Sequence, residues 1–308
     1  MLDVLAKVAS FVVIILIGTA AGHSGKFGEG ADRLISKIVF NLTLPCAIIR
    51  AFEASELDRS LLCLIAIGFA ANAVPFFLSL VVYAGKPKDE RILQQSNVAG
   101  FNIGCFALAF VQAFFPAQAA VATCLFDAGN SLMCTGGTWA LIRACVLGTD
   151  YQCFRDKAKV FARALFSSVS FDCYVVLIFM GLFGLRIPQQ AITLIDPIAN
   201  ANSFLAIFMI GLMIRFTVNK AKVVELIRLL SWRFVFATAL SLAALFLLPF
   251  DPVIRKTVAV LAWAPAPSMG PVYTLWAGGD KGLAGMANAL TILAGVVVMT
   301  SLVLILGV

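Results

Sequence analysis

Long apolar runs separated by short polar segments dominate this chain. Each run has about 20 residues, the length at which an α-helix rising about 1.5 Å per residue crosses the roughly 30 Å hydrocarbon core of a bilayer. The pattern therefore predicts an all-α polytopic membrane protein with ten transmembrane helices, near residues 5–22, 33–52, 60–84, 92–114, 118–146, 164–185, 190–214, 229–249, 254–277 and 284–307.

The first run admits a second interpretation. Lys7 precedes most of its apolar core and small residues follow at 19–21, which is also the layout of a secretory signal peptide. Cleavage there would leave nine spans and would remove the partner of the sixth span in the repeat described below.

Composition and charge agree with a membrane protein, because 61% of the residues are hydrophobic and only 13% are charged. The net charge of +7 follows from an uneven distribution of basic residues, which favours a cytoplasmic side next to anionic lipid and requires no nucleic-acid partner. We expect an integral protein of the cell (inner or plasma) membrane with both termini extracytoplasmic. The predicted cytoplasmic side and its flanks hold 17 of the 23 Lys and Arg residues: Lys26, Arg33, Lys37, Lys86, Lys88, Arg91, Arg143, Arg155, Lys157, Lys159, Arg163, Arg215, Lys220, Lys222, Arg228, Arg233 and Lys281.

The longest polar segment divides the ten predicted spans into two sets of five. We therefore expect a first repeat at 1–147, a cytoplasmic connecting loop at 148–163 and a second repeat at 164–308. Because each half has an odd number of spans, the second half must enter the membrane upside down relative to the first. Secondary transporters commonly have such inverted repeats, with the substrate site near the midplane where the halves meet.

Two spans at matching positions of the halves contain helix breakers. When Arg91 and Arg255 are aligned, Asn102 stands opposite Ala266 and Gly104 opposite Ser268, so spans 4 and 9 are interrupted at the same depth. Interrupted spans at corresponding positions are a pointer to a transporter binding site. A tolerated proline kink is the alternative for span 9. The breakers are Gly100, Asn102 and Gly104 in span 4, and Pro265, Pro267, Gly270 and Pro271 in span 9.

Three motifs resemble the auxin efflux carrier family, within the bile acid, arsenite and riboflavin transporter-like superfamily. They are Asn-Leu-Thr-Leu-Pro at 41–45, Asn-Ile-Gly at 102–104 followed by Val111 and Gln112, and the proline-rich break of span 9. The resemblance implies a bile-acid-symporter-like fold of ten helices in a 5+5 inverted repeat, with broken helices 4 and 9 crossing beside the substrate. The long central loop of the plant exporters is missing here, so the resemblance implies small carboxylates such as malate or malonate rather than auxin.

Helix breaks give the predicted site its chemistry. A broken helix leaves amide groups free at one end and carbonyl groups at the other, so an organic anion can bind without a buried lysine. We expect Ser268 to add a hydroxyl and Asn102 to cap the break of span 4; bonds within or between helices are the alternatives. The predicted substrate-binding set is Asn41, Pro45, Asn102, Gly104, Asn200, Pro265, Pro267, Ser268 and Gly270.

Asp127 is the candidate for coupling to a proton or cation. It lies about nine residues into the fifth span, where an aspartate costs roughly 2.5–3.5 kcal/mol on insertion scales. Asn130 lies three residues later on the same helix face and shares either a ligand or a hydrogen bond with it. Asp196 at the start of span 7 is interpreted as an interfacial helix cap.

The sequence favours a secondary active carrier of a small organic anion, such as a dicarboxylate or an auxin-like weak acid, that works by alternating access. It has no protease, hydrolase or nucleotide-binding motif, so we predict no enzyme, no metal site and no cofactor other than a coupling H⁺ or Na⁺. A sodium-coupled bile-acid-type symporter is the runner-up. A channel or sensor on the same scaffold is the third hypothesis. The small-residue motif at Gly18 and Gly22 is compatible with a homodimer.

Overall fold

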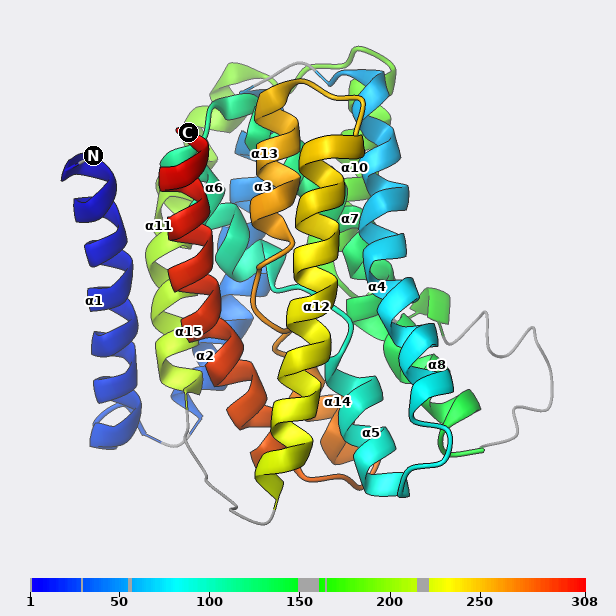
Figure 1. Ribbon diagram of the computed structural model, residues 1–308. Coiled ribbons are helices and arrows are strands. Elements are labelled where there is room, and N and C mark those ends of the chain that lie inside the picture. Colours follow the sequence, from blue (N-terminus) through cyan, green and yellow to red (C-terminus); the bar gives the residue numbers. More distant parts are fainter. Residues whose placement is uncertain (1, 29, 55–56, 149–160, 164, 215–221) are drawn as a thin grey trace.

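The computed structural model describes residues 2–28, 30–54, 57–148, 161–163, 165–214 and 222–308 (Figure 1). Helices, turns and short linkers make up these ranges, and no strand occurs within them. The connecting loop predicted at 148–163 lies almost entirely outside the described residues.

Six helical stretches of the described chain are long and apolar enough to cross a bilayer. Large apolar side chains on their outer faces are exposed, for example Leu194 and Leu247 at 77% each, as expected where lipid replaces water. This is an integral membrane protein. The stretches are α1 (Leu2–Ser24), α2–η1–α3 (Ala31–Ile38, Val39–Thr43, Leu44–Glu53), η2–α4 (Arg59–Leu62, Cys63–Val82), α11 (Gln189–Met213), α12 (Val223–Leu247) and α15 (Lys281–Leu306).

The remaining helices are shorter or interrupted. Their bounds fall largely within the other apolar runs, but the number of membrane crossings stays a prediction. They are α5 (Lys88–Asn97), η3–α6 (Ile103–Ala107, Leu108–Phe114), α7–η4–α8 (Ala117–Leu132, Met133–Gly137, Thr138–Cys145), α10 (Val169–Leu182), α13 (Pro252–Leu261) and α14 (Gly270–Trp276). The linkers 98–102 and 262–269 both lie at mid-height in the bundle (Figure 1).

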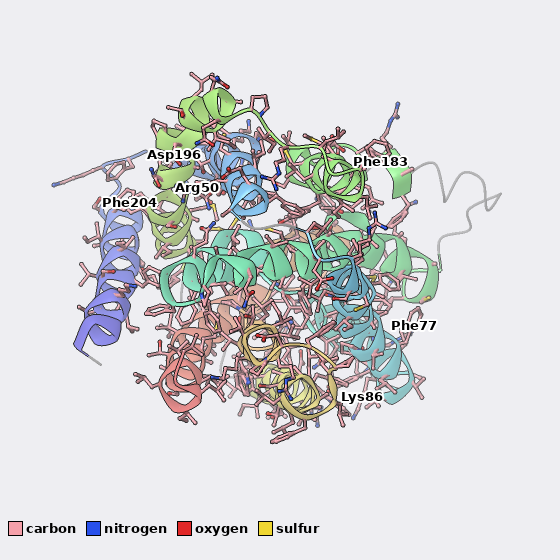
Figure 2. The ribbon with its side chains drawn as sticks, turned by 90° about the horizontal axis from the view of Figure 1, so that it is seen from above. Arg50, Phe77, Lys86, Phe183, Asp196 and Phe204 are labelled. Atoms are coloured by element: carbon pink, nitrogen blue, oxygen red, sulfur yellow. The ribbon has the colours of Figure 1, made fainter. Side chains whose placement is uncertain are left out.

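The helices form two packed groups. In the first, which we call the α1–α11 group, α1, α2–α3 and α10 gather around α11 or α3. The second, the break group, contains α4–α8 and α12–α15 and therefore both linkers. Seen from above, α3 and α11 lie on one side of the row formed by α6 and α7, and α12, α13 and α15 lie on the other (Figure 2).

Small residues allow close helix contact within the first group. A Cβ added to Gly18 of α1 would meet the carbonyl oxygen of Phe208 in α11, and one added to Gly22 would lie 3.2 Å from the carbonyl oxygen of Leu212. The small-residue motif of the first run thus packs α1 along α11.

Helix α7 joins the two groups. Its residues 119–130 are all buried, and it contacts α3 and α10 of the first group as well as α4 and α13 of its own. A Cβ at Gly68 of α4 would collide with the Phe126 backbone, and one at Gly129 with the Ile65 backbone, so both glycines are needed for the contact between α4 and α7. This packing fixes the position of Asp127 at the boundary between the groups.

Candidate functional site

The break in the fourth predicted span begins where α5 ends at Asn97. The backbone then turns at Gly100, with φ 92°, before a new helix starts at Ile103. The freed carbonyl groups point at one guanidinium, that of Arg233 in α12. Its Nη1 donates to the carbonyl oxygens of Asn97 (2.8 Å) and Val98 (3.1 Å), and its Nη2 donates to that of Gly100 (3.0 Å).

Arg233 is only 8% exposed, and no carboxylate of the described chain pairs with it. Its charge therefore compensates the negative end of the α5 half-helix instead of an acidic residue. The sequence analysis counted Arg233 among the residues of the cytoplasmic side and its flanks. The structure buries its side chain against the break, and the side of the membrane on which it lies stays a prediction. The arginine within the apolar run at 229–249 was the signal for such a partner.

Asn130 of α7 holds the other end of the same break. Its Oδ1 accepts from the Phe101 N–H at 3.0 Å, and its Nδ2 donates to the Phe101 carbonyl at 2.9 Å, so one side chain satisfies both backbone groups of one residue. The same Nδ2 donates to Oδ1 of Asp127 at 2.7 Å. Asn130 therefore links the carboxylate directly to the unwound backbone.

Asp127 also receives a hydrogen bond from the opposite helix group. The Tyr174 hydroxyl of α10 donates to its Oδ2 at 2.6 Å, and both side chains are buried. Gly104 lies beside the pair, since a Cβ there would be 3.4 Å from Asp127 Oδ2 and 2.7 Å from a methyl group of Leu44. The carboxylate thus faces the beginning of the η3–α6 half-helix, whose first N–H groups lack intrahelical acceptors.

The break in the ninth predicted span has different hydrogen-bond partners. Pro265 and Pro267 have no N–H to satisfy, and the single amide between them, that of Ala266, donates to Thr291 Oγ1 at 3.0 Å. The Pro267 carbonyl accepts from Asn288 Nδ2 at 3.3 Å and from the Gly270 N–H at 3.0 Å. Helix α15 thus supplies the side-chain partners of this break.

The two breaks contact each other directly. The Asn102 N–H donates to the Pro265 carbonyl at 2.8 Å. A Cβ at Gly100 would lie 2.6 Å from Pro267 Cγ, and one at Gly270 would collide with the Asn97 side chain, so each glycine is needed for close approach. Residues far apart in sequence therefore form one buried junction, which we call the break junction (98–102 with 262–270).

The structure does not gather every predicted site residue at this junction. Asn41 is exposed, and its amide donates to the carbonyl of Lys37 one turn earlier. Asn200 accepts from Arg50, while its neighbour Asn202 is fully buried and accepts from Thr43 at 2.9 Å. Pro45 is buried at the start of α3, next in sequence to the Leu44 that contacts Gly104.

Asn102 occupies the N-cap position of the second half-helix, but the expected side-chain cap is not formed. Its backbone ψ of 69° differs from the extended conformation in which a cap side chain reaches the N2 or N3 amide. Neither the Asn102 amide nor the Ser268 hydroxyl makes a side-chain hydrogen bond within the described residues. Both polar groups remain available to a ligand.

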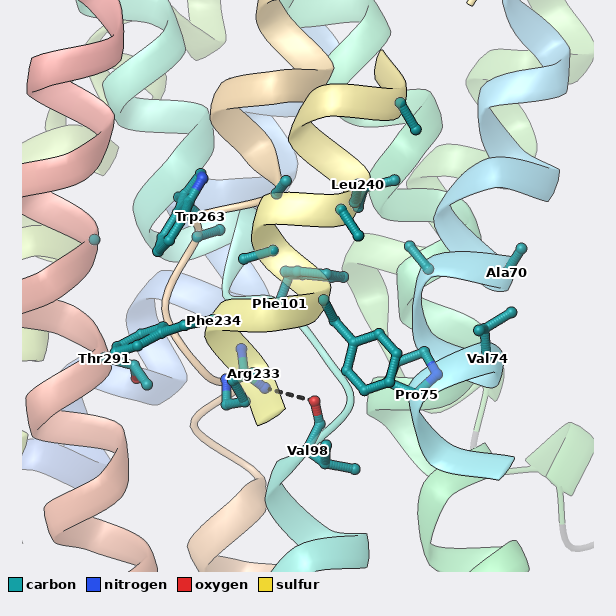
Figure 3. Close-up of a pocket in the computed structure, with 18 of the residues that line it drawn as sticks. Ala70, Val74, Pro75, Val98, Phe101, Arg233, Phe234, Leu240, Trp263 and Thr291 are labelled. Carbon is teal, nitrogen blue, oxygen red and sulfur yellow. Dashed lines mark hydrogen bonds between the residues drawn. The ribbon is translucent and has the colours of Figure 1, made fainter. Parts of the chain in front are cut away.

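Two cavities lie in the described structure, and the break junction lines one of them. One of about 340 Å³ lies between α4 and α12; both breaks line it, through Val98 and Phe101 and through 262–264, with Arg233 at one end (Figure 3). It lies within the break group. The other, of about 310 Å³, lies between α3 of the first group and α6–α7 of the second.

A family model described as membrane transport protein matches residues 3–143. The matched part is a little under half of the chain. The match confirms the resemblance to auxin efflux carriers over that range, which includes the first break, Asp127 and Asn130, and the family is one of transporters rather than enzymes. No curated protein matches the chain. The second break lies beyond the matched residues, so its assignment to the site rests on its contacts with the first.

Proposed function

We propose that this membrane transport protein is a secondary carrier of a small organic anion. The observation that carries the proposal is the break junction, joined by the bond from Asn102 N–H to the Pro265 carbonyl in the apolar interior. Substrate sites of secondary transporters are built from such discontinuous helices, whose backbone dipoles bind ions without buried charges of opposite sign. Transport by alternating access follows if the break group moves against the α1–α11 group.

Asp127 couples the anion to a proton in this proposal. The ionised carboxylate accepts from Tyr174 and Asn130 and faces the start of the η3–α6 half-helix. A substrate carboxylate would seek the same donors, and two like charges in one apolar site repel strongly. Protonation of Asp127 removes that repulsion and releases donors, so one proton and one carboxylate enter together.

Proteoliposomes test this coupling with radiolabelled malonate, malate, benzoate and indole-3-acetate under an imposed pH gradient. Asp127→Asn is expected to abolish uphill accumulation while retaining exchange of internal for external substrate, because an amide cannot carry the proton. Asp172→Asn, which changes another aspartate of a predicted span, should leave accumulation unchanged. Accumulation by the Asp127→Asn protein at the normal level would refute the coupling role.

The junction itself is tested by Pro265→Ala combined with Pro267→Ala. The double substitution adds two backbone N–H donors and allows the break to close into helix. We expect saturable uptake to fall at least tenfold, while the protein still elutes as a single folded species. Normal saturable uptake would remove the junction from the transport site.

The alternatives are separated in the same vesicles. A bile-acid-type symporter requires a sodium gradient. The candidate ligands for a sodium ion are the carboxylate oxygens of Asp127 and the Phe101 carbonyl oxygen, which both lie beside Asn130. A channel passes substrate without saturation or counterflow. Our proposal expects saturation, counterflow and uptake that is independent of sodium, in a cell membrane with both termini outside.

A further inference from the structure

The cavity between the two helix groups has a polar edge that the site described above does not use. Among the described residues, Arg50 is the only charged one in its lining, and the Gln112 amide is its other polar side chain. The remaining walls are apolar. The lining residues are Arg50, Ala51 and Ala54 of α3, Gln112 of α6, Phe115 and Pro116 of the turn, and Ala117 and Ala120 of α7.

Arg50 is held in place by the neighbouring helix α11. Its Nη1 donates to Asp196 Oδ1 at 3.2 Å and also to Asn200 Oδ1, and Arg50 and Asp196 lie next to each other when the molecule is seen from above (Figure 2). Both bonds use the same nitrogen, so Nη2 and Nε have no partner among the described residues. The side chain is 30% exposed. One edge of the guanidinium, with two parallel N–H donors, is therefore open.

The cavity lies directly above the layer that contains Asp127. Ala120 in its wall precedes Asp127 by seven residues on α7, about 10 Å along a helix. On the opposite wall, Ala51 follows Leu44 of α3 by the same number of residues, and Leu44 contacts Gly104. The cavity and Asp127 therefore lie along the same boundary between the helix groups, about two helical turns apart.

We propose that this cavity is an approach site that binds a substrate carboxylate through the open edge of Arg50, assisted by the Gln112 amide. A planar guanidinium matches a carboxylate with two parallel hydrogen bonds, and a volume of about 310 Å³ suits a small molecule. The inference rests on the proposed function. It adds a substrate preference, because the lining has one cation, so a second carboxylate would have no counter-charge. Compact monocarboxylates should bind more tightly than dicarboxylates.

Binding to the purified protein in lipid nanodiscs tests the site, with benzoate as the probe and benzamide and malonate as comparisons. We expect benzoate to bind the normal protein, malonate to bind more weakly and benzamide not to bind. Arg50→Gln should weaken benzoate binding at least tenfold. Arg50→Lys should weaken it less, since lysine keeps the positive charge but lacks the two parallel N–H donors of the guanidinium. Arg59→Gln is the matched control, because this exposed arginine donates, within the described part of the chain, only to the Leu182 carbonyl. Equal benzoate affinity in the Arg50→Gln and normal proteins, or no benzoate binding to either, would overturn the proposal.

A second measurement does not depend on the ligand. In a Gln112→Cys variant, the introduced thiol should react faster with an anionic thiosulfonate than with a cationic one of similar size, after subtraction of the reaction of the protein's other thiols. Adding Arg50→Gln should lower that rate ratio at least threefold; an unchanged ratio would show that Arg50 does not control the charge of the cavity. If benzoate binding and the ratio follow Arg50 but no carboxylate is transported, the site stands and the carrier proposal fails. If carboxylates are transported normally but benzoate binding does not change in the Arg50→Gln protein, the carrier proposal stands and the approach site at Arg50 is refuted.

Discussion

The two helix breaks lie side by side, yet they are stabilised in different ways. In the first, four backbone carbonyls accept from Arg233, and both polar groups of Phe101 are paired with Asn130. In the second, prolines remove two of the N–H donors that would need partners. Thr291 of α15 accepts from the Ala266 N–H, and Asn288 of α15 donates to the Pro267 carbonyl. Both breaks use side chains that are distant in sequence, but the first needs partners for more backbone groups, because prolines remove two of the donors of the second.

This difference matters because an unpaired backbone group buried in a membrane protein costs free energy comparable to a lost hydrogen bond. The glycine-containing break of span 4 keeps its donors and acceptors and must find partners for all of them. The proline break of span 9 has fewer groups to satisfy. We therefore expect the first break to be far more sensitive to substitution of its partners.

Arg233→Gln should have the largest effect. It removes a buried cation from the end of the α5 half-helix and leaves carbonyl groups without donors, a loss we place at about 3–5 kcal/mol of unfolding free energy, as for the removal of one partner of a buried ionic contact. Thermal unfolding in detergent measures it. Arg59→Gln, at an exposed site, should change stability by less than about 1 kcal/mol. A similar midpoint for both variants would contradict the role of Arg233.

Asn130→Ala should have the next largest effect, about 2–3 kcal/mol, because both polar groups of Phe101 lose their partner. Its counterpart in the other break is Asn288→Ala, which loses a single bond of 3.3 Å and should cost about 1 kcal/mol. Chemical denaturation of both variants under identical conditions makes the comparison direct. If Asn288→Ala were the more destabilising, the two breaks would not differ as described.

Thr291→Val should have an effect as small as that of Asn288→Ala, about 1 kcal/mol, since it leaves one buried N–H, that of Ala266, without its acceptor. Valine has nearly the shape of threonine, so packing is retained. Hydrogen exchange at the Ala266 amide should accelerate in this variant while exchange at Phe101 stays unchanged. Faster exchange at both would mean that the breaks open as one unit.

Several features of this fold could be predicted from local sequence. The apolar runs indicated membrane helices, and glycines and prolines marked two interruptions that the structure places in contact. Asp127 and Asn130 were paired by their spacing of three on one helix face, and they do share a hydrogen bond. The role of each predicted residue in transport stays a prediction.

Other parts could not be found by local rules. Tyr174, Arg233 and Thr291 come from helices remote in sequence from the groups they contact, and their role depends on which helix faces meet. The Asn41 prediction relied on a short motif and the Asn200 prediction on its place in the seventh span, whereas the helical rotation around η1 and α11 buries Thr43 and Asn202. A shift of two positions on a helix moves a side chain by more than half a turn, which a motif alone cannot resolve.

The sequence by itself determined that the chain lies in a membrane, where its helices run and where two of them break, because hydropathy and the backbone limits of glycine and proline are local properties. Tertiary structure decided how the breaks are satisfied, which helix group provides the partners of Asp127, and that Arg233 belongs to the interior. Those choices depend on which buried polar groups meet when the helices pack, and that pairing is a property of the whole packed molecule.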